Sequence, residues 1–60
     1  MTAASLAAWR ARLQVNKSEA ARRLGLSRNA YDGYESGRKR IPLYVALAAA
    51  ALAFGLPPIP

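Results

Sequence analysis

The sequence contains no cysteine, no histidine and only three acidic residues among its 60 positions. Without cysteine, neither a disulfide nor a thiolate-bound zinc ion can stabilise the fold. Without histidine, and with no carboxylate pair evident in the sequence, the chain lacks the groups that most often serve as general bases or metal ligands. We therefore expect no enzymatic activity, no metal, no cofactor and no small-molecule ligand.

Proline and glycine are also few, with four of each, and most of them lie at expected helix boundaries. Alanine is the commonest residue in the hydrophobic fraction of 53%, and it has the highest helix propensity but adds little volume to a core. A chain of this length buries only about 60% of its unfolded surface, so it lies near the lower limit for folding alone. These features predict an all-α fold of four short helices in a single domain spanning residues 1–60.

Positive charge is concentrated in the middle of the chain. All nine basic residues lie between Arg10 and Arg40, and the net charge is +6. Such charge is typical of a protein that binds a polyanion, either nucleic acid or an anionic membrane surface. The uncharged stretch from Ile41 to Leu56 has 16 residues, whereas a membrane-spanning helix needs about 20. A secretory signal requires a basic residue before its apolar run, and none precedes the first apolar run here. We expect a buried helix there, no membrane association and a cytoplasmic location.

Helix boundaries are marked by capping residues and glycines. Asn16, followed by Glu19, indicates a capping box at the start of one helix, and Gly25 supplies the left-handed conformation that ends it. Ser27 is an N-cap residue for the next helix, which Gly37 ends. Together the boundaries predict helices from Ala3 to Leu13, from Lys17 to Gly25, from Arg28 to about Ser36 and from Pro42 to Phe54, followed by a proline-rich tail at residues 55–60.

The two helices within residues 17–36 are joined by a turn of about three residues. A helix, a tight turn containing glycine and a second helix opened by serine form the sequence pattern of a helix-turn-helix, whose second helix enters the major groove of DNA. The same local pattern occurs in ordinary corners between helices. The turn alone therefore leaves both interpretations open.

The wider segment from Leu6 to Leu52 resembles the helix-turn-helix family of phage repressors and Cro proteins. The residues that carry the resemblance are Arg10, Leu13, Asn16, Glu19, Ala21, Leu24, Gly25, Ser27, Arg28, Asn29, Tyr31, Tyr34, Glu35, Gly37 and Pro42. The resemblance implies a DNA-binding fold and an ion pair between Arg10 and Glu35 that ties the first helix to the third. We favour a structural role only, in which the pair holds the two helices together. The alternative is that the pair also holds Arg10 beside the DNA backbone.

Base recognition is expected from the exposed first turns of the third helix. Each base presents its own donors and acceptors in the major groove. On this basis Arg28 can pair with guanine and Asn29 with adenine, and Asp32 can accept a hydrogen bond from cytosine. Asp32 also follows Arg28 by four residues, so orienting that guanidinium is its preferred role. Gly33 departs from the family pattern, in which a longer and often base-contacting residue stands here. The glycine either permits close approach of a phosphate or a neighbouring helix, or shifts recognition toward DNA shape.

Contacts to the DNA backbone require N–H groups, hydroxyls or flexible cations near this helix. The candidates flank it in sequence: Lys17, Ser27, Ser36, Arg38, Lys39 and Arg40. The helix N-terminus at Lys17 presents free N–H donors to a phosphate. Lys39 or Arg40 could instead reach a flanking minor groove or remain solvated, and Tyr44 either donates to a phosphate or packs.

The fourth expected helix has two apolar sides. The family pattern assigns Val45, Ala48, Ala49 and Leu52 to the core. The opposite side, together with the tail, is left for a homodimer interface formed by Leu43, Leu47, Phe54 and Leu56. The rival interpretation is that the tail folds back over this side and that dimers form only on DNA, through the loops near Arg38 to Ile41. We expect Trp9 to meet the tail.

These observations predict a sequence-specific transcription regulator that binds double-stranded DNA as a homodimer on an inverted-repeat operator, associated with the nucleoid. With no sensor or catalytic domain in 60 residues, autoregulation in a phage, prophage or mobile element is the simplest role, and occlusion of a promoter is the simplest mechanism. The alternative is an antitoxin or a protein-interaction adaptor that uses the same helical fold and basic face on an acidic partner. A membrane-active cationic peptide is a third, more distant interpretation.

Overall fold

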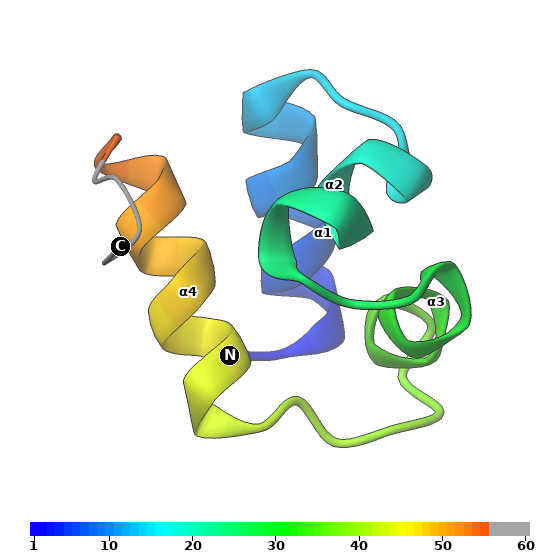
Figure 1. The fold of residues 1–60 in the computed structure, drawn as a ribbon. Coiled ribbons are helices and arrows are strands. Elements are labelled where there is room, and N and C mark those ends of the chain that lie inside the picture. Colours follow the sequence, from blue (N-terminus) through cyan, green and yellow to red (C-terminus); the bar gives the residue numbers. More distant parts are fainter. Residues whose placement is uncertain (56–60) are drawn as a thin grey trace.

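The structure, a computed structural model, describes residues 1–55, which form four helices and no strand: α1 (Ala3–Leu13), α2 (Lys17–Leu24), α3 (Arg28–Glu35) and α4 (Leu43–Ala53) (Figure 1). The all-α prediction is confirmed, and every predicted helix is present to within one residue at either end. Pro42 and Phe54, which we placed inside the last helix, are its N-cap and C-cap residues instead. The predicted tail beyond Gly55, including Leu56, lies outside the described residues.

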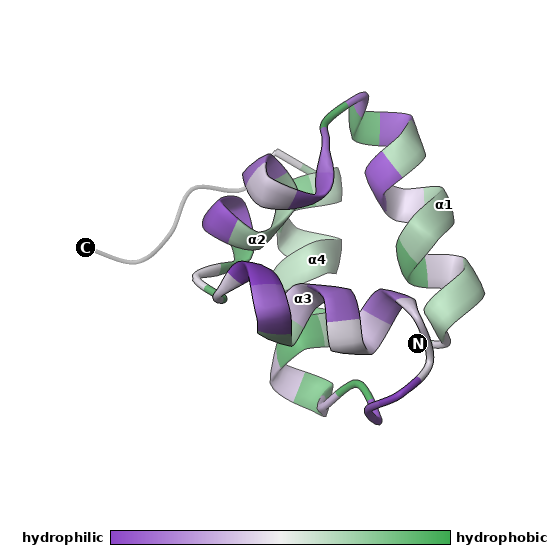
Figure 2. Ribbon diagram, turned by 90° about the vertical axis from the view of Figure 1, so that its right-hand side faces the viewer, coloured by the Kyte–Doolittle hydropathy of each residue, from purple (hydrophilic) through white to green (hydrophobic). Residues whose placement is uncertain are grey.

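The helices are arranged so that α1 and α2 each contact both α3 and α4. Figure 1 shows α4, in yellow and orange, on one side of α1 and α2, and α3, in green, on the other. In Figure 2, hydrophilic residues in purple cover much of α2 and α3, whereas α4 is mostly the green of hydrophobic residues. The helix-turn-helix pair therefore forms the polar side of the molecule, and α4 forms an apolar side.

Side-chain caps explain where the first and third helices begin. The hydroxyl oxygen of Thr2 accepts a hydrogen bond from the N–H of Ser5 at 3.1 Å, and the Ser5 hydroxyl oxygen accepts one from the N–H of Thr2 at 2.8 Å. This reciprocal capping box was not predicted. Ser27 caps α3 as predicted, because its Oγ accepts from the N–H of Ala30 at 3.1 Å.

The cap of α2 is only half of the predicted capping box. Oδ1 of Asn16 accepts from the N–H of Glu19 at 2.8 Å, as expected. The reciprocal bond from the Glu19 side chain is absent from the cap of α2, so this part of the prediction is wrong. The Glu19 carboxylate instead accepts from Arg22 Nη2 at 2.6 Å and from Arg23 Nε at 3.1 Å. Hydrogen bonds between charged groups are stronger than a bond to a neutral N–H. The pKa of Glu19 is lowered by these bonds, more by the one from Arg22 than by the one from Arg23.

The core is small and rich in alanine. Its buried residues come from all four helices: Leu6, Trp9, Ala20, Ala21, Tyr31, Val45 and Ala49. The small side chains of Ala20 and Ala21 let the backbone of α2 approach its neighbours closely. Tyr31, Leu6 and Val45 are the largest of its fully buried side chains.

Trp9 lies against α4, and the contact that we expected it to make with the tail lies outside the described residues. Its side chain is 7% exposed, and its indole N–H donates to the carbonyl oxygen of Ala49 at 2.8 Å. Because Ala49 carries only a methyl group, the backbone of α4 comes close enough to α1 for this bond. The indole N–H is thereby paired inside the core, where an unpaired donor would be costly.

The two sides of α4 differ in exposure, as predicted. Val45 and Ala49 are buried, whereas Leu43 is 74% exposed, Leu47 is 62% exposed and Phe54, just after the helix, is 83% exposed. The molecule therefore presents three large apolar side chains on the face of α4 that the rest of the described chain leaves uncovered.

No helix within residues 1–55 is long and apolar enough to cross a bilayer.

Candidate nucleic-acid interface

The turn between α2 and α3 determines how α3 is presented. Gly25 has a φ of +73°, the left-handed conformation that its position was predicted to require. The next N–H, that of Leu26, donates to the carbonyl oxygen of Ala21 at 2.9 Å, and the Leu26 side chain packs against the core. As a result the first turn of α3 is held at the surface with Arg28 and Asn29 exposed.

Arg28 reaches back to the start of α2. Its Nη1 donates to Oγ of Ser18 at 2.9 Å, so the two helices are linked on their outer surface. Sequence reasoning missed Ser18, whose only signal was a polar side chain in the first turn of α2. The other guanidinium N–H groups of Arg28 make no hydrogen bond within residues 1–55. They remain available for the paired donation that guanine O6 and N7 accept.

Asp32 does not orient Arg28, which corrects the preferred prediction. One carboxylate oxygen accepts from Nζ of Lys17 at 3.0 Å, and the other accepts from Nη2 of Arg38 at 2.9 Å. The bond to Lys17 is the main reason that the pKa of Asp32 lies below its usual value, and the charges of Arg38 and Arg28 add to the effect. Asp32 therefore connects the start of α2, the middle of α3 and the loop after α3.

The two candidate serines both bind the protein backbone. The Oγ of Ser27 is the α3 cap acceptor described above. The hydroxyl of Ser36 donates to the carbonyl oxygen of Gly33 at 3.2 Å, and its oxygen accepts from Nε of Arg38 at 3.1 Å. Arg38 is thus held at both ends of its guanidinium, by Ser36 and by Asp32. These contacts fix a cation beside the C-terminal end of α3.

Gly33 lies under the side chain of Lys39. A Cβ atom at Gly33 would lie 3.1 Å from Cδ of Lys39 and 3.3 Å from Cγ, which is tighter than ordinary van der Waals contact. The N–H of Lys39 also donates to the carbonyl oxygen of Gly33 at 3.1 Å. Of the two explanations for this glycine, the structure favours close approach, although the approaching group is a lysine stem rather than a phosphate or a helix.

Arg10 and Glu35 are brought together beneath this surface. Nε of Arg10 lies 3.1 Å from Oε1 and 3.3 Å from Oε2 of Glu35, and Nη1 donates to the carbonyl oxygen of Val15 at 3.1 Å. The Glu35 side chain is 7% exposed and that of Arg10 is 28% exposed. The pair joins α1, α3 and the α1–α2 connection. All of these contacts are internal, which favours the structural role over a contact to DNA.

The hydroxyl of Tyr31 is buried near this pair without a hydrogen-bond partner within residues 1–55. Burial, reinforced by the negative charge of Glu35, raises the pKa of Tyr31 to about 12. The phenol therefore stays neutral over the whole range in which the protein would meet DNA. Its ring, rather than its hydroxyl, is what anchors α3 to the core.

The three acidic residues are each paired with basic residues: Glu19 with Arg22 and Arg23, Asp32 with Lys17 and Arg38, and Glu35 with Arg10. Among residues 1–55, no group of three or more His, Cys, Asp or Glu side chains could hold a metal ion. The surface around α3 therefore presents cations, an amide and hydroxyls, which are the groups that bind phosphates and base edges.

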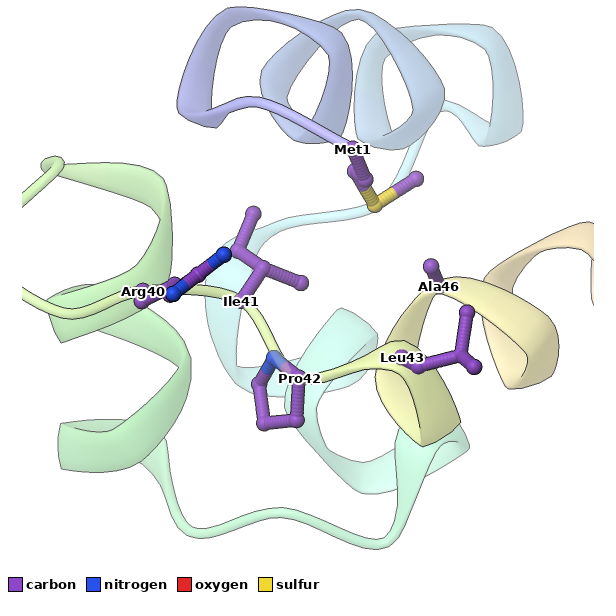
Figure 3. A pocket seen from close by; sticks show the side chains of 6 residues that line it. All are labelled: Met1, Arg40, Ile41, Pro42, Leu43 and Ala46. Atoms are coloured by element: carbon purple, nitrogen blue, oxygen red, sulfur yellow. The ribbon is translucent and has the colours of Figure 1, made fainter.

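Two open hollows lie on this part of the molecule. One is lined by Asn29, Arg38 and Lys39, beside α3. The other lies at the start of α4 and is lined by Met1, Arg40, Ile41, Pro42, Leu43 and Ala46. Figure 3 shows the second hollow with the Met1 side chain, from the start of the chain, facing Ile41 and Leu43. It continues the exposed apolar side of α4 toward the basic loop at residues 38–40.

Together, the helix pair, the glycine turn and the cations around α3 define a helix-turn-helix protein with a basic recognition surface. The sequence matches the family of helix-turn-helix domains over residues 3–59, so the chain belongs to this family. The resemblance to the helix-turn-helix family is thereby confirmed. Comparisons with curated proteins and with solved structures found no match. Because helix-turn-helix domains place their second helix in the major groove, the fold and the family indicate a DNA-binding regulator.

Proposed function

We propose that this protein is a sequence-specific regulator of transcription that binds an inverted-repeat operator as a homodimer and occludes a promoter. The observation that carries the proposal is the exposed first turn of α3, which presents Arg28 and Asn29. Further cations are held against the same helix, because Lys17 from the start of α2 and Arg38 from the following loop both bind Asp32. This arrangement suits a helix that reads bases while its flanks contact phosphates.

Base reading falls to Arg28 and Asn29 in this proposal. Arg28 pairs with guanine O6 and N7, and Asn29 pairs with adenine N6 and N7. On entering the groove, Arg28 exchanges its bond with Ser18 for a base contact. Asp32, whose two carboxylate oxygens are occupied by cations, has a positioning role rather than the contact to cytosine that its residue type allowed.

Phosphate binding is assigned to the groups that border α3: Lys17, Ser27, Ser36, Arg38, Lys39 and Arg40. Lys17 and Arg38 are held side by side by the two carboxylate oxygens of Asp32. Fixed cations lose less conformational freedom on binding than mobile ones. Lys17 and Arg38 are thus suited to contact neighbouring phosphates on one side of the major groove.

Dimerisation is assigned to the exposed side of α4. Leu43, Leu47 and Phe54 are large apolar side chains left uncovered by the described chain, and a two-fold axis beside them would pair identical patches. A dimer would place two α3 helices about 34 Å apart, one helical turn of DNA, and would add buried surface to a small core. Leu56 remains a proposed member of this interface.

The biological setting belongs to the same proposal. Autoregulation in a phage, prophage or mobile element needs only DNA binding and dimerisation, the two activities assigned above. Operator binding also requires that the protein share a compartment with DNA, so a cytoplasmic, nucleoid-associated location belongs to the same proposal.

Selection of bound duplexes from a random library, followed by competition, tests this function. A selected duplex should keep its protein in the presence of excess unrelated duplex, and deletion of one half-site should weaken binding sharply. Arg12→Ala is a matched control for Arg28→Ala, because Arg12 is an equally charged, exposed residue in a hollow with Trp9 and Ala53, on the α4 side. Equal competition by selected and unrelated duplexes would contradict sequence-specific regulation and favour the adaptor or antitoxin alternative.

A further inference from the structure

The side chain of Lys39 occupies the place where α3 lacks one. The Cβ position at Gly33 lies 3.1 Å from Cδ, 3.3 Å from Cγ and 3.5 Å from Cε of Lys39, so the lysine stem runs along this point of the helix. The backbone is fixed at the same residue, because the N–H of Lys39 donates to the carbonyl oxygen of Gly33 at 3.1 Å. Two contacts thus hold Lys39 against one turn of α3, although it comes from the loop beyond the helix.

Gly33 belongs to the recognition face of α3. It follows Asn29 by four residues, and residues four apart lie one above the other on a helix. Asn29 and Lys39 also line the same hollow, together with Arg38. The stem of Lys39 therefore lies next to Asn29 on this face of α3, in the place that a side chain at position 33 would otherwise fill.

The charge of Lys39 is not used inside the protein. Lys17 and Arg38 pair with Asp32, and Arg28 donates to Ser18. Within residues 1–55, the Lys39 ammonium has no carboxylate partner, and the residue is exposed. Among the cations beside α3, Lys39 combines a fixed stem with a free ammonium group.

We propose that Lys39 is a specificity-determining residue whose ammonium donates to the O6 and N7 acceptors of a guanine adjacent to the base pair read by Asn29. The inference rests on the proposed DNA-binding function and changes one assignment within it, from a phosphate contact to a base contact. Gly33 has a role in this proposal, since a Cβ atom there would push the lysine stem away by a few tenths of an ångström and a longer side chain would compete with it for the same place on α3.

The test uses the duplex selected by the wild-type protein and its single-base variants. Lys39→Ala should remove the preference at one base pair, with about a five- to tenfold loss of affinity on the selected duplex, the lower part of what one base pair contributes. Replacement of that guanine by 7-deazaguanine, which lacks the N7 acceptor, should weaken the wild type and leave Lys39→Ala unchanged. Arg40→Ala is the matched control, because it removes the neighbouring loop cation, and it should weaken all duplexes equally.

A second variant tests the position of Lys39 over Gly33. In the Lys39→Ala background, Gly33→Gln places a side chain at the vacated site, and a new preference for adenine should appear at the same base pair. A gain of preference at a different base pair would overturn the inference.

The outcomes separate this inference from the function on which it rests. If the wild-type protein discriminates among duplexes and Lys39→Ala weakens all of them equally, Lys39 contacts phosphate only and the inference fails while the proposed function stands. If the wild type shows no discrimination at all, the proposed function and the inference fail together. Circular dichroism should show that each variant keeps its helices, because Lys39 and Arg40 are exposed loop residues and because glutamine has a higher helix propensity than the glycine that it replaces at position 33 in α3.

Discussion

Removal of the Glu35 carboxylate should destabilise the fold far more than removal of a surface charge. The Glu35 side chain is 7% exposed, the Arg10 side chain is 28% exposed, and Arg10 Nε lies 3.1 Å from Oε1 of Glu35. In Glu35→Ala the charge of Arg10 keeps, among residues 1–55, only the carbonyl oxygen of Val15 as a partner. Breaking a buried pair costs about 3–5 kcal/mol, and the partial exposure of Arg10 lowers this to about 2–3 kcal/mol.

The loss is large on the scale of this protein. A domain of 60 residues has a total stability of roughly 3–9 kcal/mol. For a domain of this size, each kcal/mol corresponds to roughly 4–8 °C in melting temperature. Glu35→Ala should therefore melt about 10–20 °C below the wild type.

Thermal unfolding followed by circular dichroism provides the measurement. Replacement of both partners by apolar side chains, in Arg10→Met with Glu35→Leu, should recover part of the lost stability, because no charge is then left unpaired. Glu19→Ala is the control, since it removes a carboxylate that also binds two arginines but lies at the surface. Equally small effects of Glu35→Ala and Glu19→Ala, with no coupling between Arg10 and Glu35, would refute the structural role of the pair.

Local structure was predictable because its determinants act over a few residues. Asn16 and Ser27 accept hydrogen bonds from N–H groups three residues later, and Gly25 takes the left-handed conformation that ends α2. Such signals are contained in the sequence itself, so the helices were placed to within one residue. The pair of Arg10 and Glu35, 25 residues apart, was different, because only the family resemblance suggested it.

Contacts between distant side chains were not predictable from spacing. Helical periodicity made Arg28 the natural partner of Asp32, yet the partners are Lys17, 15 residues earlier, and Arg38, six residues later. Periodicity describes neighbours on one helix only. The partner of Asp32 is decided by where the fold places the start of α2 and the loop after α3.

The scarcity of acidic residues determines where positive charge remains. Within residues 1–55, five of the nine basic residues pair with a carboxylate. The unpaired ones are Arg12, Arg28, Lys39 and Arg40, and three of these four belong to α3 or to the loop that follows it. A phosphate backbone is attracted most strongly to unpaired charge. The few carboxylates thus hold Lys17 and Arg38 in place while leaving Arg28, Lys39 and Arg40 unpaired beside the recognition helix.

The remaining predictions concern recognition, pH and assembly. Arg28→Ala should lower the binding free energy for the selected duplex by about 1–3 kcal/mol and reduce the preference at one base pair. Lys17→Ala should weaken binding to all duplexes equally and lower the slope of affinity against salt concentration by about 1. Binding isotherms at several salt concentrations would show both effects. Burial raises the pKa of Tyr31 from 10.0 to about 12, so the unfolded chain releases this proton first. Stability should therefore be unaffected below pH 10 and fall between pH 10 and 12, a decline that Tyr31→Phe should remove in thermal melts. The wild-type melting temperature should rise with protein concentration if α4 forms the dimer, because association then stabilises the folded state. Leu47→Glu places a charge in that apolar contact, so this variant should sediment as a monomer, keep its helical content and bind single half-sites weakly. A wild-type protein that sediments as a monomer at micromolar concentration, and melts at the same temperature at every concentration, would rule out the α4 dimer.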